Sequence, residues 1–236
     1  MPTDRLAASL ARLSDDSADG SRTLRLCQIS VGVSGTSGAG IMLLSDDLPR
    51  GSLCTTDRIS HLVDDLQYTF GEGPSIDAYS KGKVVAEPQL TIPSMYRWPA
   101  LTLPAINAGV RALFGFPVRI GAIRLGALHL YRTRPGPLED DQYSDSLVMA
   151  DTLAQAILSA QAHSSPGHFA VESPDGANFH FVVHQAAGMI SVQLDISVTE
   201  AMIRLRARAI RTERSIDEVA RDLVGRHLRF SASDDY

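Results

Sequence analysis

The chain has 236 residues, 44% of them hydrophobic, and a formal net charge of −5. The length and composition predict one large or two ordinary domains with a packed core, and they exclude wholesale disorder. The negative charge argues against indiscriminate binding of nucleic acid by the whole surface. The sequence has no apolar run of membrane-spanning length, and its first residues lack the layout of a signal peptide. We therefore expect a cytoplasmic protein without a membrane partner.

Signatures of catalysis and metal binding fail inspection. Cys27 and Cys54 fit neither a disulfide framework nor a zinc spacing, and Cys27 is interpreted as a small buried hydrophobe. The seven histidines are scattered, without the spacing of metal ligands. Gly35–Ala39 resembles a nucleophile elbow but lacks its last glycine, and no glycine-rich phosphate loop is present. We expect no enzyme, no metal and no cofactor.

The chain divides at two clusters of turn-forming residues, 162–167 and 172–178, which follow a long predicted helix. We therefore predict a first domain over 1–162, a linker over 163–178 and a second domain over 179–236.

The first domain mixes helices and strands. Hydrophobic periodicity predicts helices over Asp4–Leu13, Thr23–Val33, Arg58–Tyr68 and Tyr143–Gln161, and strands over Gly38–Leu44, Gly51–Thr55, Val84–Ala86, Val110–Val118 and Arg124–Tyr131. The last two strands are expected to pair in antiparallel fashion. Two helices show an apolar face, formed by Ile59, Leu62, Val63 and Leu66 in one and by Leu147, Ala150, Leu153, Ala154, Ile157 and Leu158 in the other. The predicted fold class is α+β, an antiparallel sheet flanked by helices.

The second domain is predicted to contain only helices, three in number. The first covers Phe179–Leu194, with Val183, Ala187, Ile190 and Leu194 on its inner face. Ser197 with Glu200, and Ser215 with Glu218, have the spacing of capping boxes that start the second and third helices. The inner faces of these two helices are predicted to be Met202, Leu205 and Ala209, then Ile216, Val219, Ala220, Leu223 and Val224. A bundle of about 50 residues is small, so a docking partner such as a second subunit is expected.

Three groups of residues in the second domain resemble the ANTAR family of RNA-binding antitermination regulators. They are Gln185–Ile190, then Glu200-Ala201 with Leu205-Arg206, then Ile216, Val219 and Ala220. The resemblance implies a homodimer that binds paired RNA hairpins in nascent leaders and prevents a terminator from forming. Ala187 stands where the family often has lysine, so a phosphate contact would have to come from another residue, such as Arg204 or Arg208.

The first domain resembles the GAF domains that are fused to ANTAR domains in actinobacteria. The matching segments are Gly71–Pro74, Asp77-Ala78, Trp98-Pro99, Gly109–Ala112, Leu125–Tyr131 and Pro135-Gly136. The resemblance implies a sensor of an unknown small molecule that gates the helical domain. Ser75 stands where relatives often have cysteine, which argues against thiol-based sensing there, and a cyclic-nucleotide signature is absent from the sequence.

The expected RNA-binding residues are Gln185, Gly188, Met189, Arg204, Arg208 and Arg211. The three arginines recur at intervals of four and three, so they share one helix face and suit contacts to phosphates and unpaired bases. The alternative is a solvated face balanced by Glu213 and Asp217. Gly188 indicates either close helix packing or close approach to RNA.

The expected ligand pocket of the first domain consists of six residues, Tyr79, Trp98, Phe114, Phe116, His129 and Tyr131, which offer an apolar lining with a few polar groups. The alternative is that most of them are core residues. The sequence thus predicts an RNA-binding regulator controlled through a sensor domain. The rival hypothesis is a ligand-binding signalling module whose helical tail only dimerises or binds a protein.

Overall fold

The computed structural model describes residues 21–45, 51–162, 180–212 and 214–231. The chain divides into two compact units, Met1–Asn178 and Phe179–Tyr236, which are described separately below. The helix predicted over Asp4–Leu13 and the linker predicted over 163–178 lie outside the described residues.

One five-stranded antiparallel sheet forms the centre of the first unit. Its strands are β1 (Gly38–Leu43), β2 (Gly51–Thr55), β3 (Val85–Glu87), β4 (Ala112–Ile120) and β5 (Ile123–Arg132). They lie in the order β2-β1-β5-β4-β3, and every neighbouring pair is antiparallel. The predicted pairing of the last two strands is confirmed, with Phe116 opposite Leu128.

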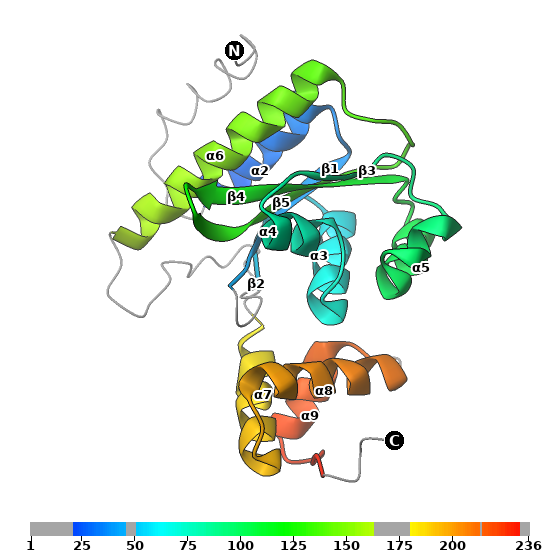
Figure 1. The fold of residues 1–236 in the computed structure, drawn as a ribbon, viewed down its shortest axis with the longest axis vertical. Helices are drawn as coiled ribbons and strands as arrows, with labels where there is room; N and C mark the ends of the chain where they lie inside the picture. The colour runs from blue at the N-terminus through cyan, green and yellow to red at the C-terminus, as the bar shows by residue number, and fades with distance from the viewer. Residues whose placement is uncertain (1–20, 46–50, 163–179, 213, 232–236) are drawn as a thin grey trace. The chain divides into compact units, whose positions relative to one another are not determined.

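Helices cover both faces of this sheet, as Figure 1 shows. On one face lie α2 (Ser21–Ser34) and α6 (Asp140–Ala162), and on the other α3 (Arg58–Phe70), α4 (Pro74–Lys81) and α5 (Pro99–Asn107). The short 3-10 helix η2 (Ile92–Tyr96) precedes α5. The sequence did not predict α5, because its apolar run contains Pro104, which removes a helical hydrogen bond.

The orientation of α3 differs from the prediction. Leu62 was expected on the inner face but is 37% exposed. The buried residues of α3 are Ser60, Val63, Asp64, Gln67 and Tyr68. The helix therefore turns a largely polar face toward the sheet, which amphipathic periodicity alone does not anticipate.

A smaller correction applies to α6. Leu147, which was placed on its apolar stripe, is 38% exposed, whereas Met149 is fully buried. Ala150, Leu153, Ala154 and Ile157 are buried as predicted. The inner face of α6 is therefore rotated slightly from the stripe read from the sequence.

The two cysteines form a disulfide, which corrects the prediction that they do not pair. Cys27 of α2 is joined to Cys54 of the edge strand β2, and both side chains are buried. Their Cα atoms lie 6.8 Å apart, within the range that a disulfide spans. Sequence spacing could not identify this pair, because nothing in it says that α2 lies beside β2.

The second unit is a bundle of α7 (Phe181–Leu194), α8 (Val198–Arg211) and α9 (Ile216–Val224). The buried side chains of these three helices are Val183, Ala186, Ala187, Ile190, Ala201, Met202, Leu205, Ala209, Ile216, Val219, Ala220 and Leu223. Leu194 and Val224 were also expected inside but are only partly buried. The three helices and most of their inner faces are thus confirmed.

The ends of these helices are held by polar contacts. Ser215 and Glu218 form the predicted reciprocal capping box of α9. Ser197 accepts a hydrogen bond from the amide of Glu200, whereas the carboxylate of Glu200 is directed to Arg204. At the start of α7, His180 bonds Asp217 of α9 over 2.7 Å. This contact ties the first turns of α7 and α9 together.

None of the described helices is by itself long and apolar enough to cross a membrane. The pair α7 and α8 meets that test only when the two are taken together, and they are bent by 107° relative to each other.

Removing the disulfide is expected to destabilise the first unit. The two cysteines are 27 residues apart, and a crosslink closing such a loop contributes about 3–4 kcal/mol in the chain-entropy model. The double change Cys27→Ala and Cys54→Ala should therefore lower the free energy of unfolding by roughly this amount. The measurement is urea denaturation of the full chain followed by fluorescence of Trp98, the sole tryptophan. Equal stability of the variant and the oxidised wild type would contradict the expectation.

Candidate functional site

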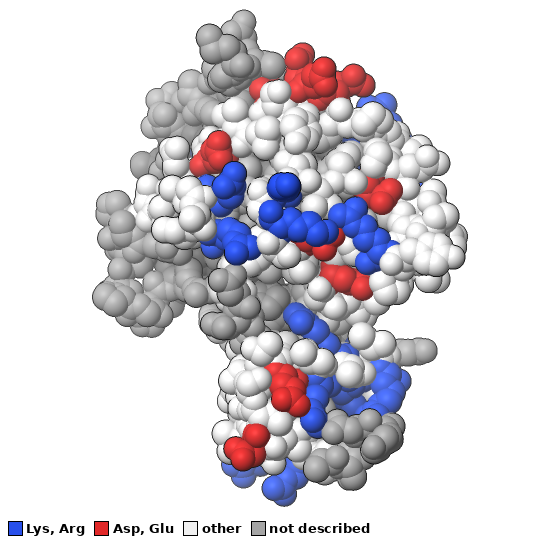
Figure 2. All heavy atoms as spheres, in the orientation of Figure 1, with Lys and Arg blue, Asp and Glu red and all other residues white. Residues whose placement is uncertain are grey.

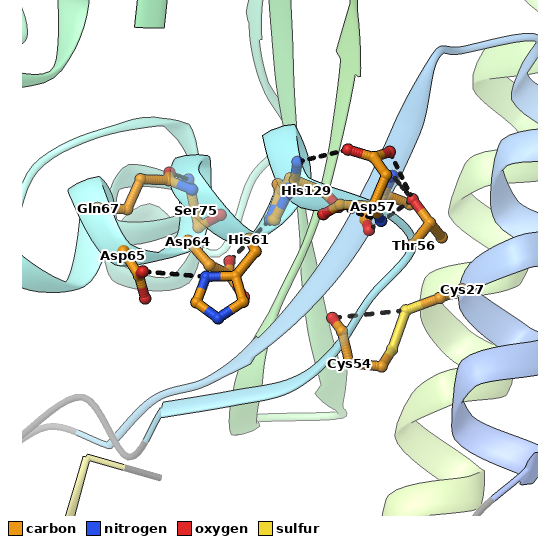
Figure 3. Close-up of polar contacts among 12 residues, drawn as sticks. Cys27, Cys54, Thr56, Asp57, His61, Asp64, Asp65, Gln67, Ser75 and His129 are labelled. Carbon is orange, nitrogen blue, oxygen red and sulfur yellow. Dashed lines mark hydrogen bonds and ion pairs between the residues drawn. A yellow bond between two sulfur atoms is a disulfide. The ribbon is translucent and has the colours of Figure 1, made fainter. Parts of the chain in front are cut away.

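The polar face of α3 lies over β5 in the interior of the first unit. Nδ1 of His129 is 2.9 Å from Oδ1 of Asp64, and both side chains are almost fully buried. Figure 3 shows this pair together with the other polar side chains of α3. An ionisable pair away from water is costly unless its members satisfy each other. His129 and Asp64 therefore have to be placed together.

Asp57 joins the start of α3 to the sheet. One of its carboxylate oxygens accepts hydrogen bonds from the amides of Ile59 and Ser60, over 2.7 and 2.9 Å, and so caps the helix. The same oxygen accepts a hydrogen bond from the hydroxyl of Tyr131 over 3.0 Å. Burial, together with this hydrogen bond, raises the pKa of Tyr131 above its ordinary value. The phenol therefore remains a hydrogen-bond donor at neutral pH.

The turn at Gly71–Pro74 organises the helices that follow. The helix α4 begins at Pro74, the last residue of this turn. Oε1 of Glu72 accepts hydrogen bonds from the amides of Ala100 and Leu101, over 2.7 and 2.9 Å. The residues of this turn thus cap α5 as well as launching α4.

The side chain of Gln67 contacts the residue that follows this turn, and two polar atoms of this contact region remain without a partner. Oε1 of Gln67 accepts a hydrogen bond from the amide of Ser75 over 2.7 Å. Nε2 of Gln67 and Oγ of Ser75 are fully buried and have no hydrogen-bond partner among the described residues. Other buried polar atoms of this unit, such as Oγ of Ser52 and Nε1 of Trp98, have no partner among the described residues either. Buried groups of this kind call for a partner such as an ordered water or a bound polar molecule.

A surface groove of about 560 Å³ opens beside the start of α3. Its lining consists of Thr55, Thr56, Asp57, Arg58, His61, Leu62 and Asp65. Nδ1 of His61 lies 2.9 Å from Oδ2 of Asp65, and the hydrogen bond between them raises the pKa of His61 to about 9. The groove therefore presents an imidazolium beside carboxylates at neutral pH.

The six residues expected to line one pocket are all buried, but the sheet separates them. The ring of Phe116 contacts Tyr143 of α6, with ring centroids 5.7 Å apart. Phe114 lies on the same face of the sheet as Phe116, because side chains two residues apart along a strand point to the same side. Trp98 and Tyr131 belong to the core on the opposite face. Phe114 and Phe116 therefore cannot line a pocket with the other four.

The remaining four predicted pocket residues are occupied by packing or polar contacts. Trp98 and Tyr131 are core residues, and His129 faces Asp64. Tyr79 lies at the end of α4, where the guanidinium of Arg124 stands over its ring at 5.4 Å. None of the six contributes to the groove beside α3. Asp64, Gln67 and Ser75, which the pocket prediction omitted, form the buried polar centre instead.

The predicted arginine face of α8 is partly engaged within its own unit. Arg204 pairs with Glu200 over 3.1 Å, one turn away on the same helix. Arg211 is exposed, and Arg208 is partly exposed with no ion pair among the described residues. Since the Arg204 pair lies at the surface, it is weak and does not prevent a contact with an external anion.

The other predicted RNA-binding residues lie on α7. Gln185 is exposed, and Gly188 and Met189 are partly exposed. A Cβ atom at Gly188 would meet no heavy atom within 4 Å, so packing inside the described part of the unit does not require glycine there. One of the two explanations for this residue, close helix packing within the bundle, is therefore removed.

Arginines are concentrated in one part of the second unit. Residues 179–236 contain eight arginines and eight acids, but all eight arginines (Arg204, Arg206, Arg208, Arg211, Arg214, Arg221, Arg226 and Arg229) lie between 204 and 229, where only four acids (Glu213, Asp217, Glu218 and Asp222) accompany them. Arg214 is held by Asp222 over 2.8 Å. Figure 2 shows arginine side chains on the surface of this unit.

In the described part of the chain, no three His, Cys, Asp or Glu residues are placed to hold a metal.

Comparison with solved structures identifies the fold of the first unit as that of GAF domains. The GAF domain of a phosphoenolpyruvate-protein phosphotransferase from Coxiella burnetii aligns with a TM-score of 0.51 and 12% identity, covering 67% of this chain and 93% of that one. The corresponding Acinetobacter domain gives 0.50 and 13%, covering 69% and 96%. A domain described as part of a sensor histidine kinase from Sinorhizobium meliloti 1021 gives 0.50 and 16%, covering 62% and 95%.

Sequence identities this low show that the first unit shares the fold of these domains, and they do not show a shared ligand or activity. No protein-family model matches the chain, and no curated protein sequence matches it either.

The pairing of His61 with Asp65 predicts a pH dependence. Because the pKa of His61 is raised from 6.5 to about 9, the stability that the pair contributes is fully present below pH 6.5 and is lost as the pH rises through 9. Asp65→Asn should move the NMR titration midpoint of His61 back toward 6.5. Asp77→Asn, which removes the partner of Lys81 instead, should leave it unchanged. An unshifted midpoint in the first variant would contradict the assignment.

Gly188→Ala should strengthen α7. Alanine is favoured over glycine within a helix by about 0.5–1 kcal/mol, and the new methyl group meets no obstacle. Hydrogen exchange of the α7 amides should slow by roughly two- to fivefold. The matched control is Gly32→Ala in α2, another helical glycine with open space around it, which should protect α2 alone. Faster exchange in α7 would show that glycine is needed there for the fold.

Proposed function

We propose that the chain is a non-enzymatic, cytoplasmic regulator whose C-terminal unit binds hairpin RNA as a homodimer, under control of its GAF-fold unit, and thereby promotes transcription through a terminator. The observation that carries this proposal is the arginine face of α8, in a stretch of a three-helix unit, residues 201–230, that has eight arginines and four acids. Arg208 and Arg211 stand at this face with solvent access, and Arg204 pairs with Glu200 at the surface.

Physical reasons favour RNA as the ligand of this face. Guanidinium groups bind phosphates with two parallel hydrogen bonds and stack on unpaired bases, so three of them in two helical turns suit a hairpin loop. The resemblance of Gln185–Ile190 and the later motif residues to the ANTAR family supports the same assignment. Since α7 carries no cation, the arginines of α8 would supply the phosphate contacts that the family's lysine supplies elsewhere.

The first unit supports a sensing role through its buried polar centre. Nε2 of Gln67 and Oγ of Ser75 together offer a donor amide and a hydroxyl at the start of α4. A small polar molecule with at least one acceptor would satisfy both atoms. Binding there would act on α3, α4 and the turn that caps α5, and so alter the outer surface of this layer.

A gel-shift measurement tests the RNA contact directly. The full chain should bind an RNA with two tandem hairpins, and Arg204→Glu with Arg208→Glu should weaken binding by roughly 100-fold, since charge reversal both removes contacts and adds repulsion. Arg208→Gln alone should reduce the salt dependence by about one released ion. The charge-matched control is Arg221→Glu with Arg229→Glu, two exposed arginines outside α8, which should change binding only a few-fold.

The rival function predicts different results in the same experiment. If the helical unit only dimerises or binds a protein, the wild-type chain will not shift the RNA. If both double variants lose binding equally, the contact is a general charge effect rather than one made by α8. Circular dichroism of each variant establishes that the helices remain folded.

A further inference from the structure

Basic side chains gather on the outer surface of the first unit, around the C-terminal end of α4. Figure 2 shows a band of Lys and Arg side chains across this unit, in the region that α4 occupies in Figure 1. Five exposed cations, which we call the α4 patch, meet there: Lys81, Lys83, Arg97, Arg119 and Arg124. The two lysines among them are the only lysines of the chain.

One carboxylate holds the first side of the α4 patch. Oδ2 of Asp77 lies 2.9 Å from Nζ of Lys81 and 2.9 Å from Nη2 of Arg97. Lys83 follows Lys81 across a single glycine and has no ion pair among the described residues. On this side, three cations therefore share one acid.

Backbone carbonyls hold the other side of the patch. Nη1 of Arg124 donates to the carbonyls of Tyr79 and Ser80 at the end of α4, over 3.1 and 2.7 Å. Arg119 stands opposite Arg124 in the pairing of β4 with β5, and it donates to the carbonyl of Gly121. Carbonyl groups orient a guanidinium without neutralising its charge, so both arginines keep a full positive charge at the surface.

Local interactions explain only part of this arrangement. The negative end of the α4 helix dipole favours Lys81 and Arg124. It does not explain Lys83 or Arg119, and two arginines directly opposite each other on neighbouring strands repel. An external polyanion would offset the repulsion within the patch. Because the whole chain has a net charge of −5, this local positive surface would direct such a ligand to one place.

We propose that the α4 patch binds the backbone of single-stranded RNA. An exposed aromatic ring favours this ligand over an acidic protein segment. Tyr96, which precedes Arg97 in the chain, is 97% exposed. Surfaces that bind single-stranded nucleic acid combine cations for the phosphates with aromatic rings on which bases stack. An acidic peptide would use the cations but not the ring.

This inference rests on the proposed function and adds a second RNA contact, located on the first unit. The arginine face of α8 is proposed to take hairpins, whereas the α4 patch would take unpaired nucleotides beside them. The two contacts have different RNA partners, so each can be measured with a probe of its own.

A structureless RNA measures the α4 patch in the full chain. The probe is fluorescent oligouridine of about 12 nucleotides, a length that such surfaces cover, and the readout is anisotropy at low salt. Lys81→Glu with Lys83→Glu should weaken binding by roughly 10- to 30-fold. Lys81→Gln with Lys83→Gln should reduce the slope of log K against log salt by about 1.4, for two phosphate contacts on a single strand.

The charge-matched control is Arg58→Glu with Arg134→Glu, two exposed cations of the same unit outside the patch. This control should change oligouridine binding by no more than a few-fold. Equal losses in the control and in the lysine variant would overturn the proposal, because the effect would then come from overall charge. Circular dichroism of each variant establishes that it remains folded.

Substitutions of Tyr96 test whether the ligand is RNA. Tyr96→Ala should weaken oligouridine binding by roughly tenfold through loss of stacking, and Tyr96→Phe should keep it within about twofold. Polyglutamate should compete poorly with oligouridine for the wild-type chain. Undiminished binding by Tyr96→Ala, or equal competition by polyglutamate, would overturn the assignment to RNA and indicate an acidic protein partner.

A second probe, the RNA with two tandem hairpins, separates this inference from the proposed function. Arg204→Glu with Arg208→Glu should lose the hairpin RNA but keep oligouridine binding within a few-fold. A wild-type chain that binds the hairpin RNA and not oligouridine would overturn the α4 patch alone. One that binds oligouridine and not the hairpin RNA would overturn the proposed function and support the patch.

Discussion

The close approach of α3 and α4 to the central sheet is the constraint on which the first unit depends. A Cβ at Gly115 of β4 would collide with the carbonyl oxygen of Pro74, and a Cβ at Gly40 of β1 would collide with the ring of His129. Gly115 therefore lets the start of α4 lie directly on the sheet, and Gly40 leaves room under α3 for the ring of His129. The polar side chains that face the sheet are therefore buried between the layers, where an unpaired polar atom is costly.

The polar contacts of α3 follow from that constraint. His129 lies against Asp64, with Nδ1 2.9 Å from Oδ1, and Asp57 receives both the first amides of α3 and the hydroxyl of Tyr131. Glu72 and Gln67 cap the next two helices. On the opposite face, the buried guanidinium of Arg132 donates to the carbonyl of Ser34, the carbonyl of Pro137 and the side chain of Gln142, which ties β5 to the end of α2 and the start of α6. The sheet is thus anchored on both faces by charged groups that packing has removed from water.

Much of the architecture could be predicted from the sequence, because hydrophobic periodicity and capping residues act locally. The strands, the long helices and the three-helix bundle all carry such local signals. The orientation of α3 carries none: its polar residues face inward because of partners on β5 that are far along the chain. A histidine inside the buried β5 strand was the one available hint that a carboxylate had to lie opposite. The disulfide between Cys27 and Cys54 is non-local in the same way, and α5 was hidden by Pro104.

The candidate sites show the same division between local and non-local information. The arginine spacing on α8 is a local property and the helix displays it as predicted, although Arg204 is partly engaged by Glu200. The proposed aromatic pocket required knowledge of which strand face each ring occupies, and the alternation along β4 places Phe114 and Phe116 on the wrong side for it.

The proposal that the C-terminal unit recognises RNA is tested most directly in cells. The full chain is crosslinked to RNA by ultraviolet light, and the recovered RNA is sequenced beside that from a strain carrying Arg204→Glu and Arg208→Glu. We predict that the wild-type chain enriches leader segments with two hairpins upstream of a terminator and that the variant loses this enrichment while remaining folded. Recovery of the same scattered RNA by both chains would contradict the proposed function.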